Sequence, residues 1–353
     1  MSGALSSSKL VERSLGLAVL VLVGAGPAFL DDYWVSVILT ETFLVGIAAA
    51  SLIFLSAYGG MVSLAQTALV GIAAFTMGNV VTTDATQGLN LGWNPWIGVV
   101  VAIAIATAIG LVFGAIASRS LGIYFLMITL AYGVIGFFFF LQVDKLSGRA
   151  GIPTIRDHAP GIVGGSNAGP ARLYYVALIV ALAVYVVIRY IVRTPFGITL
   201  QGIRDEPIRM ASLGYNVPLH RTLAFGLAGA IASLSGVLFV WWNDQVDPAT
   251  VDLNAIVALL IVAVIGGLGR IEGAWLGAFA YIVINNYVRD VSVPLLGGSF
   301  PTVIGFIFLA IVLVSPDGLI GIWGRVLELL ERGGRSGPAA EAQAAGGPGA
   351  GSG

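Results

Sequence analysis

Long apolar runs separated by short polar connections fill most of this chain. Ten runs approach the length of about 20 residues that a helix needs to cross a bilayer. Backbone groups in lipid must be bonded within their own segment, so we expect each run to be helical. The pattern predicts an all-α, polytopic integral membrane bundle. Its spans are residues 14–30, 35–57, 59–81, 95–117, 121–141, 173–191, 222–242, 254–269, 273–288 and 300–322.

Three of these runs differ from an uninterrupted span. The third run carries Ser63, Gln66 and Thr67 in its middle, and the eighth and ninth runs are short. Irregular backbone at membrane depth is tolerated where it lines a cavity. We therefore expect these three runs to be broken or re-entrant elements beside a translocation path.

Two segments share a pattern of glycines that indicates a duplicated core. Gly60 is followed by Gly71, and Gly267 by Gly277, each time with Ala and Phe close behind. Internal repeats in transporters show such weak sequence similarity, although the abundance of glycine in this chain can produce it as well. If the core is duplicated, the path lies between the two copies. Its predicted lining is Ser63, Gln66, Thr67, Gly266, Gly267 and Gly269.

Small residues recur every four positions at the start of the ninth run. Gly269, Gly273 and Gly277 form a ridge of the kind that lets another helix approach closely. We predict helix packing as their role. Arg270 and Glu272 flank the ridge, and we expect them in a turn at the inner membrane edge, where a salt bridge to the neighbouring loop is open to them.

Composition supports a lipid-embedded chain. Of its 353 residues, 58% are hydrophobic and 10% charged, and the mean hydropathy is +0.95. Soluble domains carry about 25% charge. The net charge of −1 supplies no basic field for nucleic acid. Cysteine is absent and the two histidines, His158 and His220, are not spaced as ligands, so we expect neither a metal site nor a bound cofactor.

The two ends of the chain differ in composition from the apolar runs. The first run follows Lys9 and Arg13 as in a signal peptide, but further spans follow and no small-x-small cleavage site ends it. We expect it to be retained. Residues 333–353 are rich in Gly, Ala and Pro and are expected to be a disordered tail. Residues 1–332 are then the membrane domain.

The distribution of Lys and Arg predicts the orientation in the membrane. With the N-terminus inside, twelve of the 17 basic residues fall on the inner side and five on the outer side. Positive residues collect on the cytoplasmic side, so both termini are expected there. An error of one span would change this result. The inner residues are Lys9, Arg13, Arg119, Arg189, Arg193, Arg204, Arg209, Arg221, Arg270, Arg325, Arg332 and Arg335.

The connection at residues 194–217 has signals for two short helices. Thr194-Pro195 provides an N-cap followed by a proline at the first helical position. Glu206-Pro207 starts a second helix, because the residue before proline avoids the helical region. Gly214 suits a left-handed stop. The segment predicts either a compact docking surface for a soluble partner or a solvated loop that only reverses the chain.

Several stretches resemble one family of transporters. They are similar to the permease subunits of ATP-binding-cassette importers, and more narrowly to branched-chain amino-acid permeases of the LivM type. Together with their flanks they cover most of residues 33–323. The stretches are GGMVSLAQTALVGIAAFT (59–76), LGIYFLMITLAYG (121–133), TPFGITLQGIRDEPIRMASLGYNV (194–217), LAFGLAGAIASLSGVLF (223–239) and VIGGLGRIEGAWLGA (264–278).

The resemblance implies a division of labour between subunits. In this family the inner loop contacts the ATPase subunit, a second permease of LivH type completes the path, and an extracytoplasmic binding protein delivers the cargo. Ala65 and the segment 147–151 depart from the family pattern, which leaves the cargo in doubt. The resemblance implies ATPase coupling for Arg204, Asp205, Glu206, Pro207, Arg209, Ala211, Leu213 and Gly214.

The absence of a nucleotide-binding motif agrees with that division. The chain has no G-x-x-x-x-G-K-[ST] loop, so ATP and magnesium would be bound by partner subunits and this chain would not be an enzyme. The predicted function is a plasma-membrane permease for leucine, isoleucine or valine. Urea or a short amide remains an alternative cargo.

Glu41 supports a function of another class. It lies within the second run, and an acid inside a span is by default a functional candidate. A proton- or sodium-coupled carrier that works alone would need such a group. An intramembrane enzyme is the third alternative, but the spans contain no matching catalytic or metal-ligand constellation.

Overall fold

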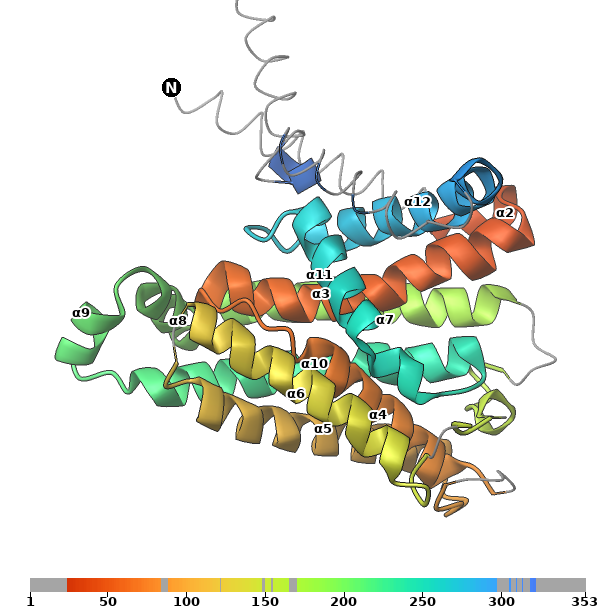
Figure 1. Cartoon of the computed structure of the whole chain (residues 1–353), viewed down its shortest axis with the longest axis horizontal. Coiled ribbons are helices and arrows are strands. Elements are labelled where there is room, and N and C mark those ends of the chain that lie inside the picture. The colour runs from red at the N-terminus through yellow and green to blue at the C-terminus, as the bar shows by residue number, and fades with distance from the viewer. Residues whose placement is uncertain are drawn as a thin grey trace, which may run out of the picture.

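The computed structural model describes residues 24–83, 88–120, 122–147, 150–153, 155–164 and 170–296, with residues 305, 309, 313 and 318–321. In this part every named element is a helix (Figure 1). Ile152 and Val246 form an isolated antiparallel bridge. The elements are α2 (Gly26–Phe29), η1 (Trp34–Leu39), α3 (Thr40–Gly59), α4 (Gln66–Val81), α5 (Pro95–Ala117), α6 (Ile123–Gln142), η2 (Arg156–His158), α7 (Pro170–Arg193), α8 (Pro195–Asp205), α9 (Pro207–Ser212), α10 (Val217–Asn243), η3 (Pro248–Val251), α11 (Leu253–Gly266) and α12 (Gly273–Leu296).

Five described helices have the length and composition to cross a membrane, and two shorter apolar helices accompany them. The polytopic helical fold predicted from the sequence is therefore confirmed. Most of the first run, the run 300–322 and the tail 333–353 lie outside the described residues, as does the predicted total of ten spans. The five long helices are Trp34–Gly59, Pro95–Ala117, Ile123–Gln142, Ala171–Arg193 and Val217–Asn243, and the shorter ones are Gln66–Val81 and Leu253–Gly266.

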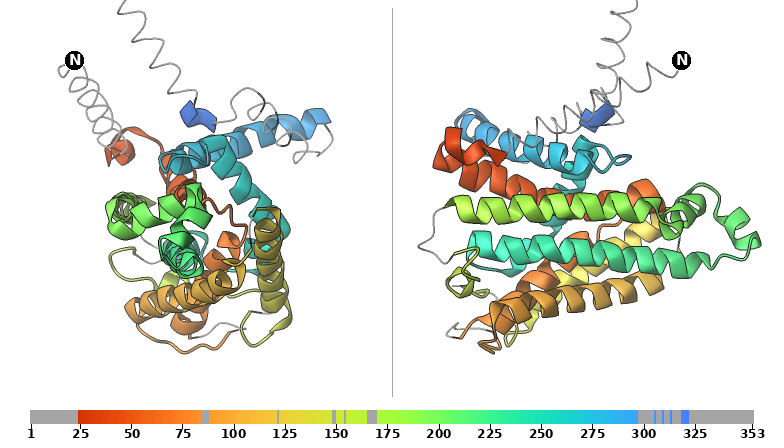
Figure 2. Two further views of the ribbon diagram at one scale, coloured as in Figure 1. Left: turned by 90° about the vertical axis from the view of Figure 1, so that its left-hand side faces the viewer. Right: turned by 180° about the vertical axis from the view of Figure 1, so that it is seen from behind.

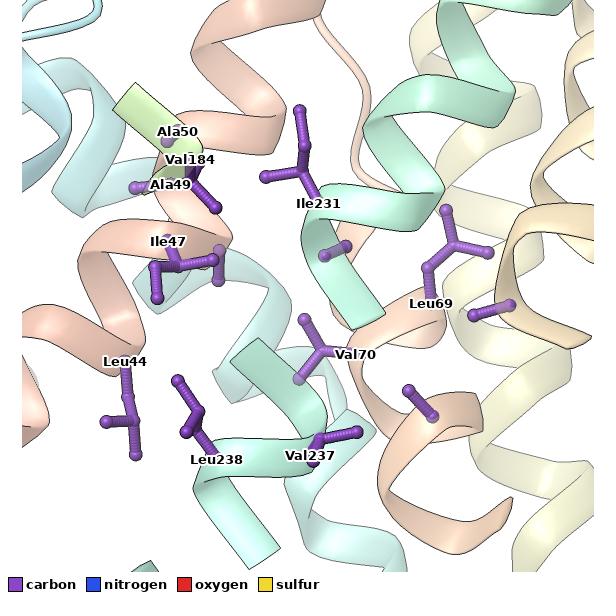
Figure 3. Packing of buried hydrophobic residues seen from close by; sticks show 14 of the residues in the cluster. Leu44, Ile47, Ala49, Ala50, Leu69, Val70, Val184, Ile231, Val237 and Leu238 are labelled. Atoms are coloured by element: carbon purple, nitrogen blue, oxygen red, sulfur yellow. The ribbon is translucent and has the colours of Figure 1, made fainter. Parts of the chain in front are cut away.

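The centre of the bundle is an antiparallel pair, α3 and α10. The hydroxyl of Ser235 on α10 donates to the backbone oxygen of Leu44 on α3 at 2.7 Å, and the indole of Trp242 donates to Ser36 O at 2.8 Å. Figure 3 shows the apolar side chains between these helices and α4, among them Ile47 and Val70. Most of α3 is buried, because α4, α7, α8, α10, α11 and α12 all pack against it.

The outer helices have a different exposure. α5, α6 and α7 leave long apolar side chains uncovered, as expected for faces turned toward lipid or another subunit. Their inner faces carry small residues. A side chain at Gly114 of α5 would collide with the Cβ of Phe225 on α10 at 2.7 Å, so α5 lies close against α10.

The third run is broken, as the sequence predicted: α3 continues to Gly59, residues 60–65 are not helical, and α4 begins only at Gln66. Gly60, with a φ of +65°, ends α3 in the left-handed region that glycine tolerates. Two predicted boundaries are wrong. α10 begins at Val217 and not at 222, since Asn216 caps it and its first turn extends beyond the apolar run. α12 continues to Leu296 and does not end at 288.

The connections separate to the two ends of the bundle. Figures 1 and 2 show α9 protruding at one end, beyond α8, while the loops after α4, α6 and α10 lie at the other end. The loops at that far end are tied together, because Arg156 N donates to the Asp244 carboxylate at 2.8 Å beside the Ile152–Val246 bridge.

Candidate functional site

The α8–α9 segment follows the signals read from the sequence. Thr194 caps α8 and accepts a hydrogen bond from Gly197 N at 3.4 Å, and Pro195 is the first helical residue. α8 ends at Asp205, where Glu206 leaves the helical region ahead of Pro207. Gly214 follows α9 with a φ of +90°. Both short helices and the left-handed stop are therefore present where the sequence placed them.

α8 is fastened to the end of α3. Leu200 and Ile203 are fully buried, and the Arg204 guanidinium donates to the backbone oxygen of Ala57. Arg204 Nε also donates to the Asp205 carboxylate at 2.8 Å. A side chain at Gly60 would meet Arg204 Cγ at 2.7 Å, so only glycine fits beneath this arginine. Arg204, together with buried Leu200 and Ile203, thus holds α8 against the bundle.

α9, by contrast, presents its side chains to the surroundings. Ile208 is 81% exposed and Leu213 is 67% exposed, and Arg209 and Ala211 are exposed beside them. We call these four residues the α9 surface. Exposed apolar side chains with an adjacent charge, on a helix that protrudes from the bundle, are typical of a protein-interaction site. Sequence reasoning missed Ile208 as a surface residue, because its apolar character favoured the interior.

The second candidate region is the break between α3 and α4. Ser63, Ala65 and Gln66 are fully buried and Thr67 is 6% exposed. The irregular backbone is held by side chains: Leu64 N donates to Thr129 Oγ1 of α6 at 3.2 Å, and Ala65 N donates to Ser63 Oγ at 3.3 Å. This is irregular backbone covered by protein, the condition under which membranes tolerate it.

Gln66 is the first residue of α4 and lies against α3. Its Oε1 is 3.1 Å from Ser51 Oγ, and Ala48 O is 2.6 Å from the same hydroxyl, which has one proton to donate. Its amide nitrogen is buried and has no hydrogen-bond partner among the described residues. Buried polar groups are nearly always satisfied, so this nitrogen requires an explanation.

The other predicted path residues lie in the connection between α11 and α12. Gly266 ends α11 and packs on the backbone of Gly273, while Gly267 has a φ of +110°. A side chain at Gly269 would meet none of the described residues within 4 Å. Residues 60–66 instead adjoin the first turn of α11, since a side chain at Gly133 would touch both Ile256 and the backbone oxygen of Leu64.

The predicted packing ridge is divided by the same connection. Gly273 and Gly277 lie on α12 against the end of α11, where a side chain at Gly277 would approach Val262 O to 2.1 Å. Gly269 precedes α12 and lies in the turn. Glu272 closes this turn and pairs with Arg189 of α7 at 3.4 Å, while Arg270 is exposed. The expected salt bridge thus runs from Glu272 to α7.

Glu41 lies in the first turn of α3 and is partly buried. Because η1 runs directly into α3, it is the eighth residue of the continuous span Trp34–Gly59. It is therefore about two turns inside that helix.

At the opposite end from α9, a depression of about 360 Å³ is lined by residues that include Thr83, Trp93, Asp157 and His158. Among the described residues no cluster suited to a metal ion occurs.

Comparison with known proteins supplies the family. The family model described as branched-chain amino acid transport system / permease component matches residues 35–315. The LivH branched-chain amino acid permease of Methanocaldococcus jannaschii is 26% identical over 161 residues, which cover 44% of this chain and 50% of that protein. The LivM permease of Escherichia coli is 30% identical over 129 residues, 36% of this chain and 30% of that protein.

A third relative aligns over more of its length. The LivM permease of M. jannaschii is 26% identical over 265 residues, covering 68% of this chain and 74% of that protein. The chain thus spans half or less of the first two relatives and about three quarters of the third. No solved structure matches the chain.

Proposed function

This chain belongs to the family of branched-chain amino acid transport permeases, and we propose that it is a membrane-spanning subunit of an ATP-driven importer for such amino acids. It forms part of the translocation path and performs no chemistry itself. Separate ATPase subunits bind ATP and magnesium, and they deliver the energy through the α9 surface.

The observation that carries this proposal is the contrast between α8 and α9. α8 is fixed to α3 by Arg204 and by buried Leu200, whereas α9 projects Ile208 and Leu213 beyond the bundle. Because α8 is fixed to the bundle and α9 offers exposed apolar side chains to a soluble partner, the pair can transmit movement of that partner to the membrane helices. Because the chain lacks a phosphate-binding loop, the partner must hold the nucleotide.

The same proposal sets the orientation and the partners. The α8–α9 end faces the cytoplasm of a plasma membrane, and both termini lie on that side. An extracytoplasmic binding protein delivers the solute to the opposite end. A second permease of LivH type covers part of the apolar surface that α5, α6 and α7 leave exposed. Leucine, isoleucine and valine are the proposed cargo.

Reconstitution tests the proposal directly. Proteoliposomes that contain this chain, the second permease, two ATPases and the binding protein should accumulate radiolabelled leucine only when ATP is present on the ATPase side. Omission of the ATPases is the matched control. Uptake that continues without them, or that follows an imposed proton or sodium gradient, would overturn the proposal and favour a carrier that works alone.

A further inference from the structure

The N-terminus of α4 is the buried start of a helix that has no side-chain cap. Its N-cap residue is Ala65, whose methyl group cannot accept a hydrogen bond. The backbone N–H groups of Gln66, Thr67 and Ala68 have no acceptor among the described residues. The start of a helix carries a partial positive charge, and buried N–H groups without partners are unfavourable. This end of α4 is therefore suited to an acceptor or an anion.

The other short apolar helix, α11, has a side chain that caps its N-terminal N–H groups. α11 also begins after a nonhelical stretch, but Asp252 caps it and accepts from Ala255 N at 2.7 Å. Asn94 and Asn216 cap α5 and α10 in the same way. α4 differs in placing its open end inside the protein, and its first residues are 0% to 6% exposed.

The depth of this terminus follows from its contact with α3. Gln66 meets Ser51, which lies eight residues before the end of α3 at Gly59. At 1.5 Å per residue, α4 begins about 12 Å inside that end of the bundle. Thr129 of α6 and Ile256 of α11 cover the same region. The side chains named here carry no charge that could neutralise the terminus.

Gln66 adds a second, independent observation. Its side chain is fully buried beside the terminus, and its amide nitrogen is a donor without a partner. Three backbone donors and one amide donor thus lie in the first turn of α4 without an acceptor among the described residues.

We propose that the N-terminus of α4, together with Gln66, holds the carboxylate of the transported solute in the middle of the bundle. Helix N-termini bind carboxylates through their free N–H groups, and the effect is larger away from water. The inference rests on the proposed import function and narrows its cargo, because urea and neutral amides lack the carboxylate that this terminus requires.

The chain has no cysteine, so a single introduced thiol reports on this site alone. In Thr67→Cys the backbone N–H is retained, and labelling by N-ethylmaleimide is measured in the assembled transporter during ATP turnover. Leucine and 4-methylvalerate, which both carry a carboxylate, should slow labelling by about tenfold, whereas leucinamide should not. Equal protection by all three compounds would overturn the proposal. So would a thiol that never reacts, because the terminus would then not meet the solute path.

A charge substitution provides the complementary readout. Gln66→Glu places a carboxylate beside the bound carboxylate and should raise the KM for leucine uptake by about tenfold or more, while ATP hydrolysis continues. Thr76→Val, on the same helix but away from its start, is the matched control and should leave the KM unchanged. An unchanged KM in Gln66→Glu would contradict the site. If the wild-type assembly imports no leucine, the proposed function fails, and the thiol assay still decides whether carboxylates bind here.

Discussion

The carboxylate of Glu272 lies 3.4 Å from the guanidinium of Arg189 and also accepts a hydrogen bond of 3.0 Å from Tyr185. Arg189 is in the last turns of α7, which leads through Thr194 into α8. Glu272 closes the turn between α11 and α12. The pair therefore joins the helix that carries the α8–α9 segment to a second broken region of the bundle.

We expect this ion pair to contribute little to stability. Its side chains are 45% and 40% exposed, and exposed pairs contribute about 0–1 kcal/mol. Glu272→Gln should therefore lower the melting temperature in detergent only slightly, with Arg270→Gln as the control at an exposed position in the same turn. Arg189→Glu should be partly rescued by the reversed pair with Glu272→Arg. A loss of several kcal/mol from Glu272→Gln would show that the pair is shielded from solvent.

The α11–α12 packing predicts a contrast between two glycines. Gly277→Ala should destabilise the protein by about 1–3 kcal/mol, because the new methyl group would lie 2.1 Å from Val262 O and the backbone must shift. Gly269→Ala would meet none of the described residues and should change stability by less than about 0.5 kcal/mol. Chemical or thermal unfolding of the purified protein measures both. Equal effects would contradict the close approach of α12 to α11.

Much of this fold could be predicted from the sequence. The apolar runs 95–117, 121–141 and 173–191 match α5, α6 and α7 within three residues at each end, because their limits coincide with polar or helix-breaking residues. Thr194, Glu206-Pro207 and Gly214 located the two short helices through local backbone preferences alone. Such signals depend only on neighbouring residues, so they can be read without the structure.

The break before α4 could not be placed from the sequence in the same way. Ser63, Gln66 and Thr67 indicated a break within residues 59–81, but nothing local shows that the nonhelical residues are 60–65. The break is held by Thr129 of α6 and by Arg204 of α8 above Gly60, which lie far along the chain. The open terminus of α4 is a product of those tertiary contacts. For the same reason, Gly266 and Gly267 could be predicted to line the translocation path only from a repeated glycine pattern. The contacts that place them are made by residues distant in the sequence.

Substitutions in the α9 surface should weaken binding of the ATPase subunits without changing the stability of the permease. Ile208→Asp combined with Leu213→Asp should reduce recovery of the ATPase subunits in a pull-down by about tenfold or more, since exposed apolar anchors dominate such interfaces. The thermal stability of the permease should be unchanged, because both side chains are mostly exposed. The substitution Ile198→Asp, at an exposed position on α8, is the matched control. Full recovery of the ATPases would remove α9 as the contact.

Glu41 distinguishes the importer from an ion-coupled carrier. If energy comes from ATP, Glu41→Gln should leave the dependence of uptake on ATP unchanged and should create no dependence on proton or sodium gradients. Its position two turns inside the span Trp34–Gly59 makes it the acid that a carrier would use. Ion-driven uptake in the wild type that disappears in Glu41→Gln would contradict the account.

The sidedness of α9 tests the central claim most directly. Because the chain contains no cysteine, Leu213→Cys can be labelled with a membrane-impermeant maleimide in vesicles of known orientation. We predict labelling only when the cytoplasmic face is outside, and protection when the ATPase subunits are bound. Labelling from the extracytoplasmic side, or labelling that the ATPases do not affect, would contradict the transfer of energy through α9.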